Sequence, residues 1–171
     1  IAAESEGDVA DAVAYAAREG LPLFVLGGGS NIVIADEGVA GVVLSMELRG
    51  VRFEAEGART VVSARAGEPW DELVRRCVER DLAGLECLSG IPGLVGATPI
   101  QNVGAYGQEI AETVSSVRAL RRSDGRVVTL SNADCRFAYR DSFFKSEAPG
   151  ELVVLEVSFA LAAGGAPAVR Y

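Results

Sequence analysis

The chain has 171 residues, 49% of them hydrophobic and 23% charged, which is enough for one large domain or two small ones with hydrophobic cores. Its formal net charge of −8 argues against nucleic acid or an anionic membrane surface as a partner. The sequence has no histidine, which excludes histidine-dependent nucleophilic relays, histidine metal sites and attachment of a cofactor through histidine. It has no uncharged apolar stretch of about 20 residues and no basic region before an apolar core, so we expect neither a membrane span nor a signal peptide.

Residues 1–48 have the pattern of a small α/β unit. Ser5 and Asp8 have the spacing of a capping box, apolar residues then recur at helical spacing up to Ala17, and Gly20 follows as a stop signal. Short apolar runs predict strands at residues 21–26, 32–34 and 42–44. No strand is predicted before the helix, so we expect the first strand of this unit to be missing.

Residues 49–163 have the pattern of a larger, β-rich unit. Alternating residues predict hairpins over 51–64 and 114–130 and a final strand over 152–161, and a helix is predicted to begin at Pro69. The segment 84–107 is rich in Gly and Pro but also apolar, which predicts an ordered, partly buried segment. Residues 164–171 are interpreted as a linker towards a further, C-terminal domain. The fold class expected from the two units is α+β.

The three cysteines, Cys77, Cys87 and Cys135, are an odd number and show no Cys-x-x-Cys spacing. This usage predicts reduced thiols in an intracellular protein, buried as small hydrophobic residues. Chemistry at a site in this chain is therefore expected from carboxylates, arginines, hydroxyls or a cofactor.

Three consecutive glycines follow the first predicted strand, in the sequence Gly27-Gly28-Gly29-Ser30-Asn31. Without Cβ atoms, successive main-chain N–H groups can converge on an anion, and the serine and asparagine can add side-chain donors. No Gly-Lys-Ser/Thr follows, which excludes a P-loop, and a strand rather than a helix is predicted next, which excludes the dinucleotide-binding fingerprint. A tight turn between strands explains the same residues, and the spacing alone leaves both interpretations open.

A second glycine-rich segment runs from Ser89 to Thr98, with glycines three residues apart at positions 90, 93 and 96. This spacing allows close approach of another backbone along one side of a short helix. A helix packed tightly on its neighbour is the alternative. A dinucleotide pyrophosphate needs donors from more than one side, and two such segments in one small chain favour that ligand.

Two further segments carry polar side chains suited to a ligand. In Gln101-Asn102-Val103-Gly104-Ala105-Tyr106 the two amides can recognise the edge of a heterocycle and the tyrosine can stack, although a polar turn would have the same composition. In Tyr139-Arg140-Asp141-Ser142 the arginine can bind a carboxylate through two hydrogen bonds. A surface ion pair between the arginine and the neighbouring aspartate is the local alternative.

Three ordered motifs together resemble those of the UDP-N-acetylenolpyruvoylglucosamine reductase family, in its first subtype. The first motif is Leu26 to Asn31 and the second is Gly90 to Gly107. The third is the run Phe137-Ala138-Tyr139-Arg140-Asp141-Ser142-Phe143-Phe144-Lys145. They occur in the family's order and cover most of the chain, so the resemblance is specific.

The resemblance implies an FAD-binding domain of the p-cresol methylhydroxylase/vanillyl-alcohol oxidase type, with subdomains at residues 1–48 and 49–163. It also implies a cytoplasmic, monomeric flavoenzyme of peptidoglycan precursor synthesis, needed for cell shape and division. Such an enzyme binds FAD non-covalently and uses NADPH to reduce UDP-N-acetylglucosamine-enolpyruvate to UDP-N-acetylmuramate. Hydride reaches C3 of the enolpyruvyl group from flavin N5, and a proton reaches C2. Neither nucleic acid nor a membrane is an expected partner.

The resemblance also implies roles for individual residues. Arg140 corresponds to the family's catalytic arginine, which holds the substrate carboxylate and stabilises the enolate, and a fixed guanidinium is suited to that task. Tyr106 and Tyr139 are assigned to the substrate together with Arg140, and no metal site is expected. The implied cofactor-binding residues are Gly27, Gly28, Gly29, Ser30, Asn31, Ile32, Ser89, Gly90, Ile91, Pro92, Gly93, Gly96, Ala97, Thr98, Ile100, Gln101, Asn102, Gly104 and Ala105.

The family's proton-donating serine and second acid belong to a domain that we expect beyond Tyr171. Ser142 belongs to the arginine motif and is not assigned as the proton donor. Two alternatives stay open, namely another flavin oxidoreductase of the same fold and a non-catalytic module that binds FAD or a nucleotide sugar.

Overall fold

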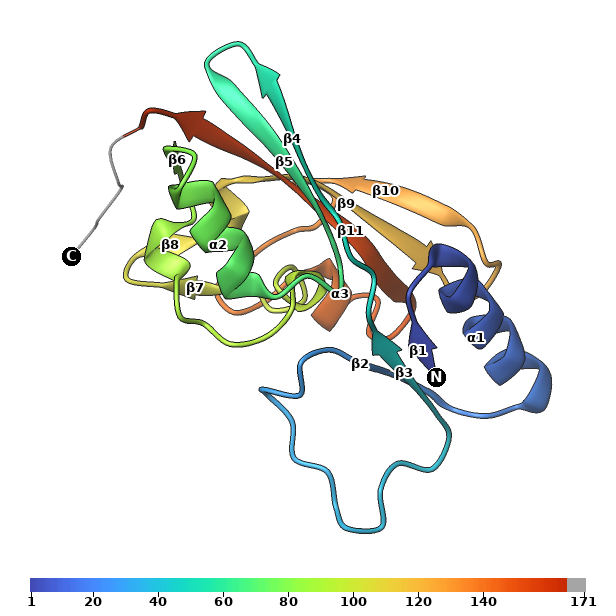
Figure 1. Cartoon of the computed structure of the whole chain (residues 1–171). Coiled ribbons are helices and arrows are strands. Elements are labelled where there is room, and N and C mark those ends of the chain that lie inside the picture. The colour runs from blue at the N-terminus through green and yellow to red at the C-terminus, as the bar shows by residue number, and fades with distance from the viewer. Residues whose placement is uncertain (166–171) are drawn as a thin grey trace.

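Two sheets of different type form the framework of the computed structural model, which describes residues 1–165 (Figure 1). The smaller sheet has three parallel strands in the order β1-β3-β2. The larger sheet is antiparallel, in the order β10-β9-β11-β5-β4, and β6 pairs with β11 outside this path. The mixture of a helix-linked parallel sheet and a larger antiparallel one is the expected α+β arrangement.

The smaller sheet consists of β1 (Ala2–Ala3), β2 (Leu23–Leu26) and β3 (Val42–Met46), and α1 (Glu6–Glu19) connects the first two. The capping box predicted at Ser5 and Asp8 is present, and Gly20 ends the helix with a left-handed φ of 65°. The expectation that no strand precedes this helix was wrong, because β1 pairs in parallel with β3. Two residues are too few to give a periodic signal in the sequence.

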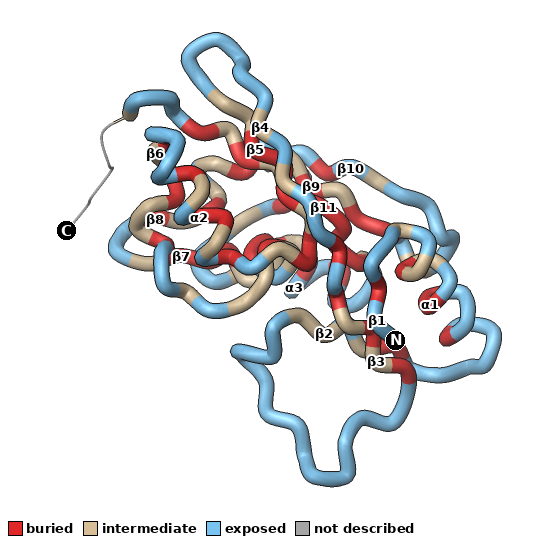
Figure 2. Tube along the Cα trace, viewed as in Figure 1, coloured by how far each residue is buried: buried red, intermediate tan, exposed pale blue. Residues whose placement is uncertain are grey.

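The predicted strand at residues 32–34 is also absent from the structure. The chain leaves β2 at Leu26 and runs as a loop away from the body before it returns in β3 (Figures 1 and 2). Ile32, Val33 and Ile34 are all exposed on this loop. An apolar run becomes a strand only when it pairs with another strand, and residues 32–34 pair with none of the strands in residues 1–165.

The larger sheet matches the predicted hairpins. The hairpin of β4 (Val51–Glu56) and β5 (Arg59–Arg65) turns at residues 57–58, and β9 (Val114–Arg121) pairs with β10 (Val127–Ser131). The long strand β11 (Leu152–Ala163) lies between the two hairpins and is mostly buried (Figure 2). Residues 166–171 of the expected linker lie outside the described residues.

One helix and a long connecting segment cover the larger sheet. Helix α2 (Trp70–Val78) follows Pro69, and its Trp70 ring lies 5.8 Å from that of Phe159 in β11. The segment predicted at 84–107 is ordered and partly buried, with Leu85, Leu88 and Val95 in the core. The remaining short elements are β6 (Leu82–Ala83), η1 (Glu86–Leu88), η2 (Val95–Ala97), β7 (Gly104–Ala105), β8 (Gln108–Glu109), η3 (Ile110–Glu112) and α3 (Phe143–Ser146).

The core is continuous between the two sheets. The boundary expected at residue 48 falls between β3 and β4, yet buried side chains from both sheets belong to one hydrophobic cluster. Cys77 and Cys135 are free and buried in it as predicted, and burial raises the pKa of their thiols to about 11 and about 12, whereas Cys87 is only half-buried. Within residues 1–165, no helix is both long enough and apolar enough to cross a membrane.

Candidate functional site

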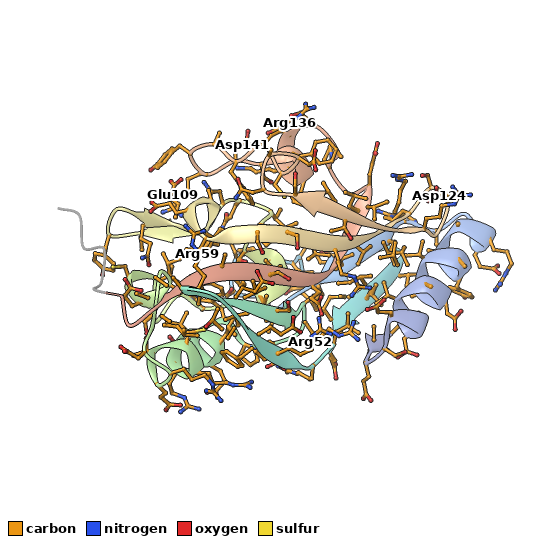
Figure 3. The ribbon with its side chains drawn as sticks, turned by 90° about the horizontal axis from the view of Figure 1, so that it is seen from above. Arg52, Arg59, Glu109, Asp124, Arg136 and Asp141 are labelled. Atoms are coloured by element: carbon orange, nitrogen blue, oxygen red, sulfur yellow. The ribbon has the colours of Figure 1, made fainter. Side chains whose placement is uncertain are left out.

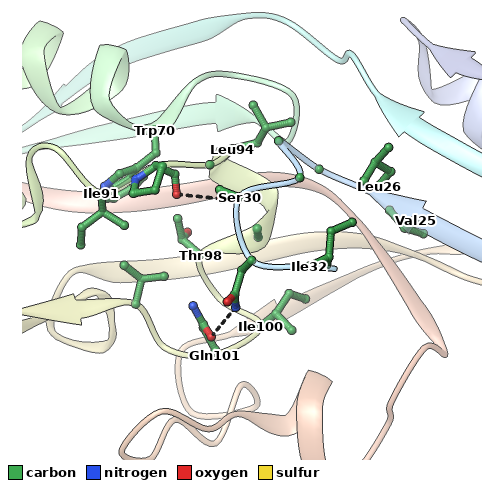
Figure 4. Close-up of a pocket in the computed structure, with 18 of the residues that line it drawn as sticks. Val25, Leu26, Ser30, Ile32, Trp70, Ile91, Leu94, Thr98, Ile100 and Gln101 are labelled. Atoms are coloured by element: carbon green, nitrogen blue, oxygen red, sulfur yellow. Dashed lines mark hydrogen bonds between the residues drawn. The ribbon is translucent and has the colours of Figure 1, made fainter. Parts of the chain in front are cut away.

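The two glycine-rich segments face each other across one cavity (Figure 4). The cavity has a volume of about 440 Å³ and is lined by the end of β2, the loop after it, α2, residues 91–103 and α3. The structure therefore brings together most of the expected cofactor-binding residues. Those in the lining are Gly27, Gly28, Gly29, Ser30, Asn31, Ile32, Ile91, Pro92, Gly93, Ala97, Thr98, Ile100 and Gln101.

Two side-chain hydrogen bonds connect the first segment to the second and to Gln101, which follows the second (Figure 4). The Ser30 hydroxyl donates to the carbonyl of Pro92 at 3.3 Å, and the Asn31 amide donates to Oε1 of Gln101 at 3.5 Å. A Cβ atom at Gly28 would lie 3.3 Å from Cα of Gly93, so a larger residue there would push the segments apart. The absence of a side chain at this position sets the width of the cavity on that side.

The loop after β2 has the properties of an anion-binding turn. Among the hydrogen bonds of residues 1–165, the main-chain N–H groups of Gly28, Gly29 and Ser30 have no acceptor within the protein. Gly29 has a left-handed φ of 69°, and a Cβ atom there would meet only open space. Consecutive free N–H groups next to a left-handed residue can bind phosphate oxygens.

The residues of the second segment differ in what they contact. Ser89 and Gly90 bind Asp71, residues 91–93 line the cavity, and Gly96 packs against Ala66. Asp71 Oδ1 accepts hydrogen bonds from the main chain of Gly90 at 2.6 Å and the Ser89 hydroxyl at 2.9 Å. These bonds lower the pKa of the Asp71 carboxyl, first through Gly90 and then through Ser89. Ser89 and Gly90 thus lie outside the cavity lining and hold the turn that leads into it.

Gly96 fits the alternative interpretation of tight packing. Its N–H donates to the carbonyl of Ala66 at 2.9 Å, and a Cβ atom on it would lie 2.6 Å from that of Ala66. It lines an adjoining cavity of about 320 Å³, which shares Gly27, Leu94 and other residues with the first. The two adjoining cavities are lined by glycines and by apolar side chains.

Lys145 is a cavity residue that the sequence analysis did not assign. It is the only lysine of the chain and lies in α3. Its side chain lines the cavity, and its Nζ donates to the carbonyl of Arg140 at 2.7 Å. The sequence shows only that this lysine ends the third motif, and its position in the cavity depends on how α3 packs.

The residues assigned to the substrate line a separate cavity of about 270 Å³. Its walls include Gly104, Ala105, Tyr106, Glu109, Tyr139 and Arg140, so two residues assigned to the cofactor lie here instead. Arg140 is exposed, and its guanidinium carbon lies 5.8 Å from the centre of the Tyr139 ring. Tyr106 and Arg140 both have left-handed φ values, 51° and 54°, which non-glycine residues rarely adopt.

The ion pair suggested as the local alternative for Arg140 is not formed. Among residues 1–165, no carboxylate lies within ion-pair distance of its guanidinium. Asp141 instead accepts a hydrogen bond from the Ser146 hydroxyl at 2.5 Å, and this bond with that from Ser142 lowers the pKa of the Asp141 carboxyl. The arginine is therefore available to an external carboxylate.

Asn102 lies in neither cavity lining. Its side chain is fully buried, and its amide is hydrogen-bonded to Glu109, Ala138 and Ala111. Ser142 is also buried, and its hydroxyl donates to the carbonyl of Ile100 at 2.6 Å.

Sequence comparison relates the chain to a family of flavoproteins. The family model for the FAD binding domain matches residues 1–131. The UDP-N-acetylenolpyruvoylglucosamine reductase of Streptomyces coelicolor is 50% identical over 161 residues, which are 94% of this chain and 41% of that protein. The enzyme of the same name from Pseudomonas fluorescens is 46% identical over 160 residues, 93% of this chain and 47% of that protein. The chain thus spans less than half the length of these curated relatives.

Two solved structures share the fold. UDP-N-acetylenolpyruvylglucosamine reductase (MurB) from Thermus caldophilus matches with a TM-score of 0.77 and 27% identity, over 96% of this chain and 55% of its own. For 6-hydroxy-D-nicotine oxidase from Arthrobacter nicotinovorans the TM-score is 0.70 and the identity 23%, over 94% of this chain and 35% of its own, so that likeness concerns the fold alone. These likenesses confirm the expected fold of the p-cresol methylhydroxylase/vanillyl-alcohol oxidase type.

Proposed function

Because the chain belongs to the FAD binding domain family, we propose that it is the FAD-binding part of a UDP-N-acetylenolpyruvoylglucosamine reductase. In this proposal the protein reduces UDP-N-acetylglucosamine-enolpyruvate to UDP-N-acetylmuramate at the expense of NADPH. It would act as a cytoplasmic monomer in peptidoglycan precursor synthesis. The observation that carries the proposal is the cavity whose two walls are the glycine-rich segments joined at Ser30–Pro92 and Asn31–Gln101.

The residues of the chain suit FAD binding without a covalent bond. The free N–H groups of Gly28, Gly29 and Ser30 would hold the pyrophosphate, and Lys145 adds a positive charge to the same cavity. The chain has no histidine that could form a covalent link to a flavin. When bound, FAD supplies hydride transfer between NADPH and C3 of the enolpyruvyl group.

Arg140 would bind the substrate carboxylate. A guanidinium presents two parallel N–H donors to a carboxylate, and its charge stabilises the negative charge that develops at C2 and in the conjugated carboxylate. Tyr106 and Tyr139 border the same cavity and would contact the substrate beside it.

Flavin binding can be tested on the 171-residue chain itself. Trp70 is the only tryptophan and lines the cavity, so titration with FAD should quench its fluorescence. Acid precipitation of the loaded protein should release the yellow chromophore into the supernatant. A flavin that stays in the pellet would refute non-covalent binding, and the absence of any quenching or flavin absorbance would refute the cavity assignment.

The reaction requires a separate test, on a version that extends to the length of the curated relatives. Consumption of NADPH that depends on UDP-N-acetylglucosamine-enolpyruvate and yields UDP-N-acetylmuramate would support the proposed activity. FAD binding without this turnover would favour a non-catalytic module. Oxidation of alcohols or hydroxy acids in its place would favour another flavin oxidoreductase of the same fold.

A further inference from the structure

The loop that carries Arg140 is closed by its own main chain. Ala138 and Asp141 exchange two main-chain hydrogen bonds, each of 3.0 Å, so Tyr139 and Arg140 stand at the tip. Tyr139 is 82% exposed at this tip, and Arg140 has the left-handed φ of 54° already noted. A loop with an exposed tip and a strained residue needs support at its base if the guanidinium is to keep one position.

The base of the loop is held by Asn102. The Asn102 amide nitrogen donates to the carbonyl of Ala138 at 2.9 Å and to Oε2 of Glu109 at 2.7 Å. Its amide oxygen accepts the main-chain N–H of Ala111 at 3.1 Å. Both amide hydrogens and the oxygen are therefore used within the protein, and these partners fix the orientation of the amide.

Asn102 is bonded both to a residue of the Arg140 cavity and to the loop that carries Arg140. Glu109, in β8, lines this cavity, and Ala138 lies two residues before Arg140 in the chain. Figure 3 shows Glu109 and Asp141, the residue after Arg140, on the same side of the molecule. Asn102 is fully buried, and its backbone has a left-handed φ of 48°.

We propose that Asn102 is a positioning residue, which holds the Arg140 loop through Ala138 and does not itself contact FAD. The proposal rests on the proposed function for the role of Arg140 towards a carboxylate. It differs from the family resemblance, which placed Asn102 among the cofactor-binding residues. Arg140 itself remains the group that touches the substrate.

The substitution Asn102→Asp tests this role, because aspartate tolerates the left-handed backbone but cannot donate to Ala138. Hydrogen exchange of the peptide 137–143 should become roughly tenfold faster, the factor expected for one lost hydrogen bond. The affinity for FAD, measured by Trp70 quenching, should change less than twofold.

Gln108→Glu is the matched control. Gln108 is also a buried amide that donates to a carboxylate, Glu86, and accepts a main-chain N–H, that of Cys87. It makes no bond to the Arg140 loop, so exchange of the peptide 137–143 should be unchanged in this variant.

A second variant distinguishes the loss of the Ala138 hydrogen bond from a general loss of stability. In Asn102→Asp/Glu109→Gln, the glutamine amide can donate to the new carboxylate, so this contact is restored while the bond to Ala138 stays lost. The melting temperature should recover and the fast exchange of 137–143 should persist. Recovery of slow exchange in the double variant would overturn the proposal.

In the longer version, Asn102→Asp should slow substrate reduction about a hundredfold, as misplacement of a catalytic group by about 1 Å can. In an Arg140→Ala background the same substitution should add little, because Asn102 acts through Arg140. Additive losses, or a loss of FAD affinity equal to the loss of rate, would overturn the proposal. No reduction by the unsubstituted protein would refute the proposed function, while the exchange experiment would still decide the role of Asn102.

Discussion

Glu6, in the first turn of α1, and Arg118, in β9, form a two-point ion pair between residues 112 positions apart in the chain. The two terminal guanidinium nitrogens of Arg118, Nη1 and Nη2, each lie 3.2 Å from a different carboxylate oxygen of Glu6. Arg65 of β5 donates to the same carboxylate, and Arg118 also lies 3.7 Å from Glu156 in β11. Figure 3 shows Arg52, which contacts Glu156 from β4 at 3.4 Å. These charges connect the helix of the small unit to four strands of the large sheet.

Replacing Glu6 by glutamine should therefore lower stability in a pH-dependent way. Burial raises the pKa of the Glu6 carboxyl, but the hydrogen bonds and charges of Arg118 and Arg65 outweigh it and hold the pKa below its ordinary value of 4.5. The stability that this ion pair adds is therefore fully present above pH 4.5, and it is lost as the pH falls through the lower pKa of Glu6 in the folded state. At pH 7 we expect Glu6→Gln to cost about 1 kcal/mol, or about 2–4 °C in melting temperature.

This prediction is tested by measuring the melting temperatures of the unsubstituted protein and of Glu6→Gln at pH 7 and at pH 3. The difference between the unsubstituted protein and Glu6→Gln should be smaller at the lower pH. Glu79→Gln, which removes an exposed partner of Arg75 on α2, should change little at either pH. A Glu6→Gln difference that is the same at both pH values would contradict the ion-pair account.

Gly29→Ala should weaken FAD binding, and Gly57→Ala provides the matched control. Both glycines have left-handed φ values, 69° and 62°, and open space where a Cβ would lie. Each alanine should cost about 1 kcal/mol of stability from backbone strain alone. Only at position 29 does relief of the strain turn N–H groups away from the cavity, so only Gly29→Ala should raise the Kd for FAD, about tenfold. Equal Kd values in both variants would support the plain-turn interpretation.

Asp71→Ala should loosen the second wall of the cavity. Asp71 fixes the turn at Ser89 and Gly90, which leads directly into Ile91, Pro92 and Gly93 in the lining. We expect a severalfold increase in the Kd for FAD, measured by Trp70 quenching. Asp134→Ala removes the same kind of contact, to the N–H and hydroxyl of Ser131, at a distant turn and should leave the Kd unchanged. If both variants bind FAD equally well, Asp71 is not an anchor of the cavity.

Arg140→Lys in the longer version should impair substrate reduction despite the retained charge. Lysine is a point donor and cannot supply the two parallel hydrogen bonds of a guanidinium. The rate of substrate reduction should fall about 10²–10³-fold, whereas reduction of the flavin by NADPH should stay near normal. Stopped-flow measurement of the two half-reactions decides this, with thermal melts to confirm folding. Loss in both half-reactions, or in neither, would exclude a catalytic role for Arg140.

The sequence was informative where local chemistry decides the structure. The capping box at Ser5, the hairpin over 51–64 and the alternation in β11 each depend on a few neighbouring residues, and all were predicted. The run Ile32–Ile34 shows the limit, because whether an apolar run becomes a strand depends on a partner strand that local pattern cannot reveal. Cavity residues were predictable from the glycine motifs, whereas the position of Lys145 depends on how α3 packs.

The assignment of Asn102 shows the same limit within the candidate site. Its place in the second motif, beside the amide of Gln101, suggested a ligand contact, but its partners Glu109 and Ala138 come from segments 7 and 36 residues away. Only the folded arrangement shows that these partners use its whole amide. Sequence could thus identify the motif as important without showing on which side of the chain its polar atoms would point.

The position of β11 in the sheet determines when the larger sheet can be completed during synthesis on the ribosome. The two hairpins, β4–β5 and β9–β10, are complete in the nascent chain by Ser131, but they touch the same sheet only through β11, which ends at Ala163. Until β11 emerges, the edges of β5 and β9 that pair with it have no partner strand. A nascent chain that ends before Leu152 therefore lacks the strand that joins the two hairpins into one sheet.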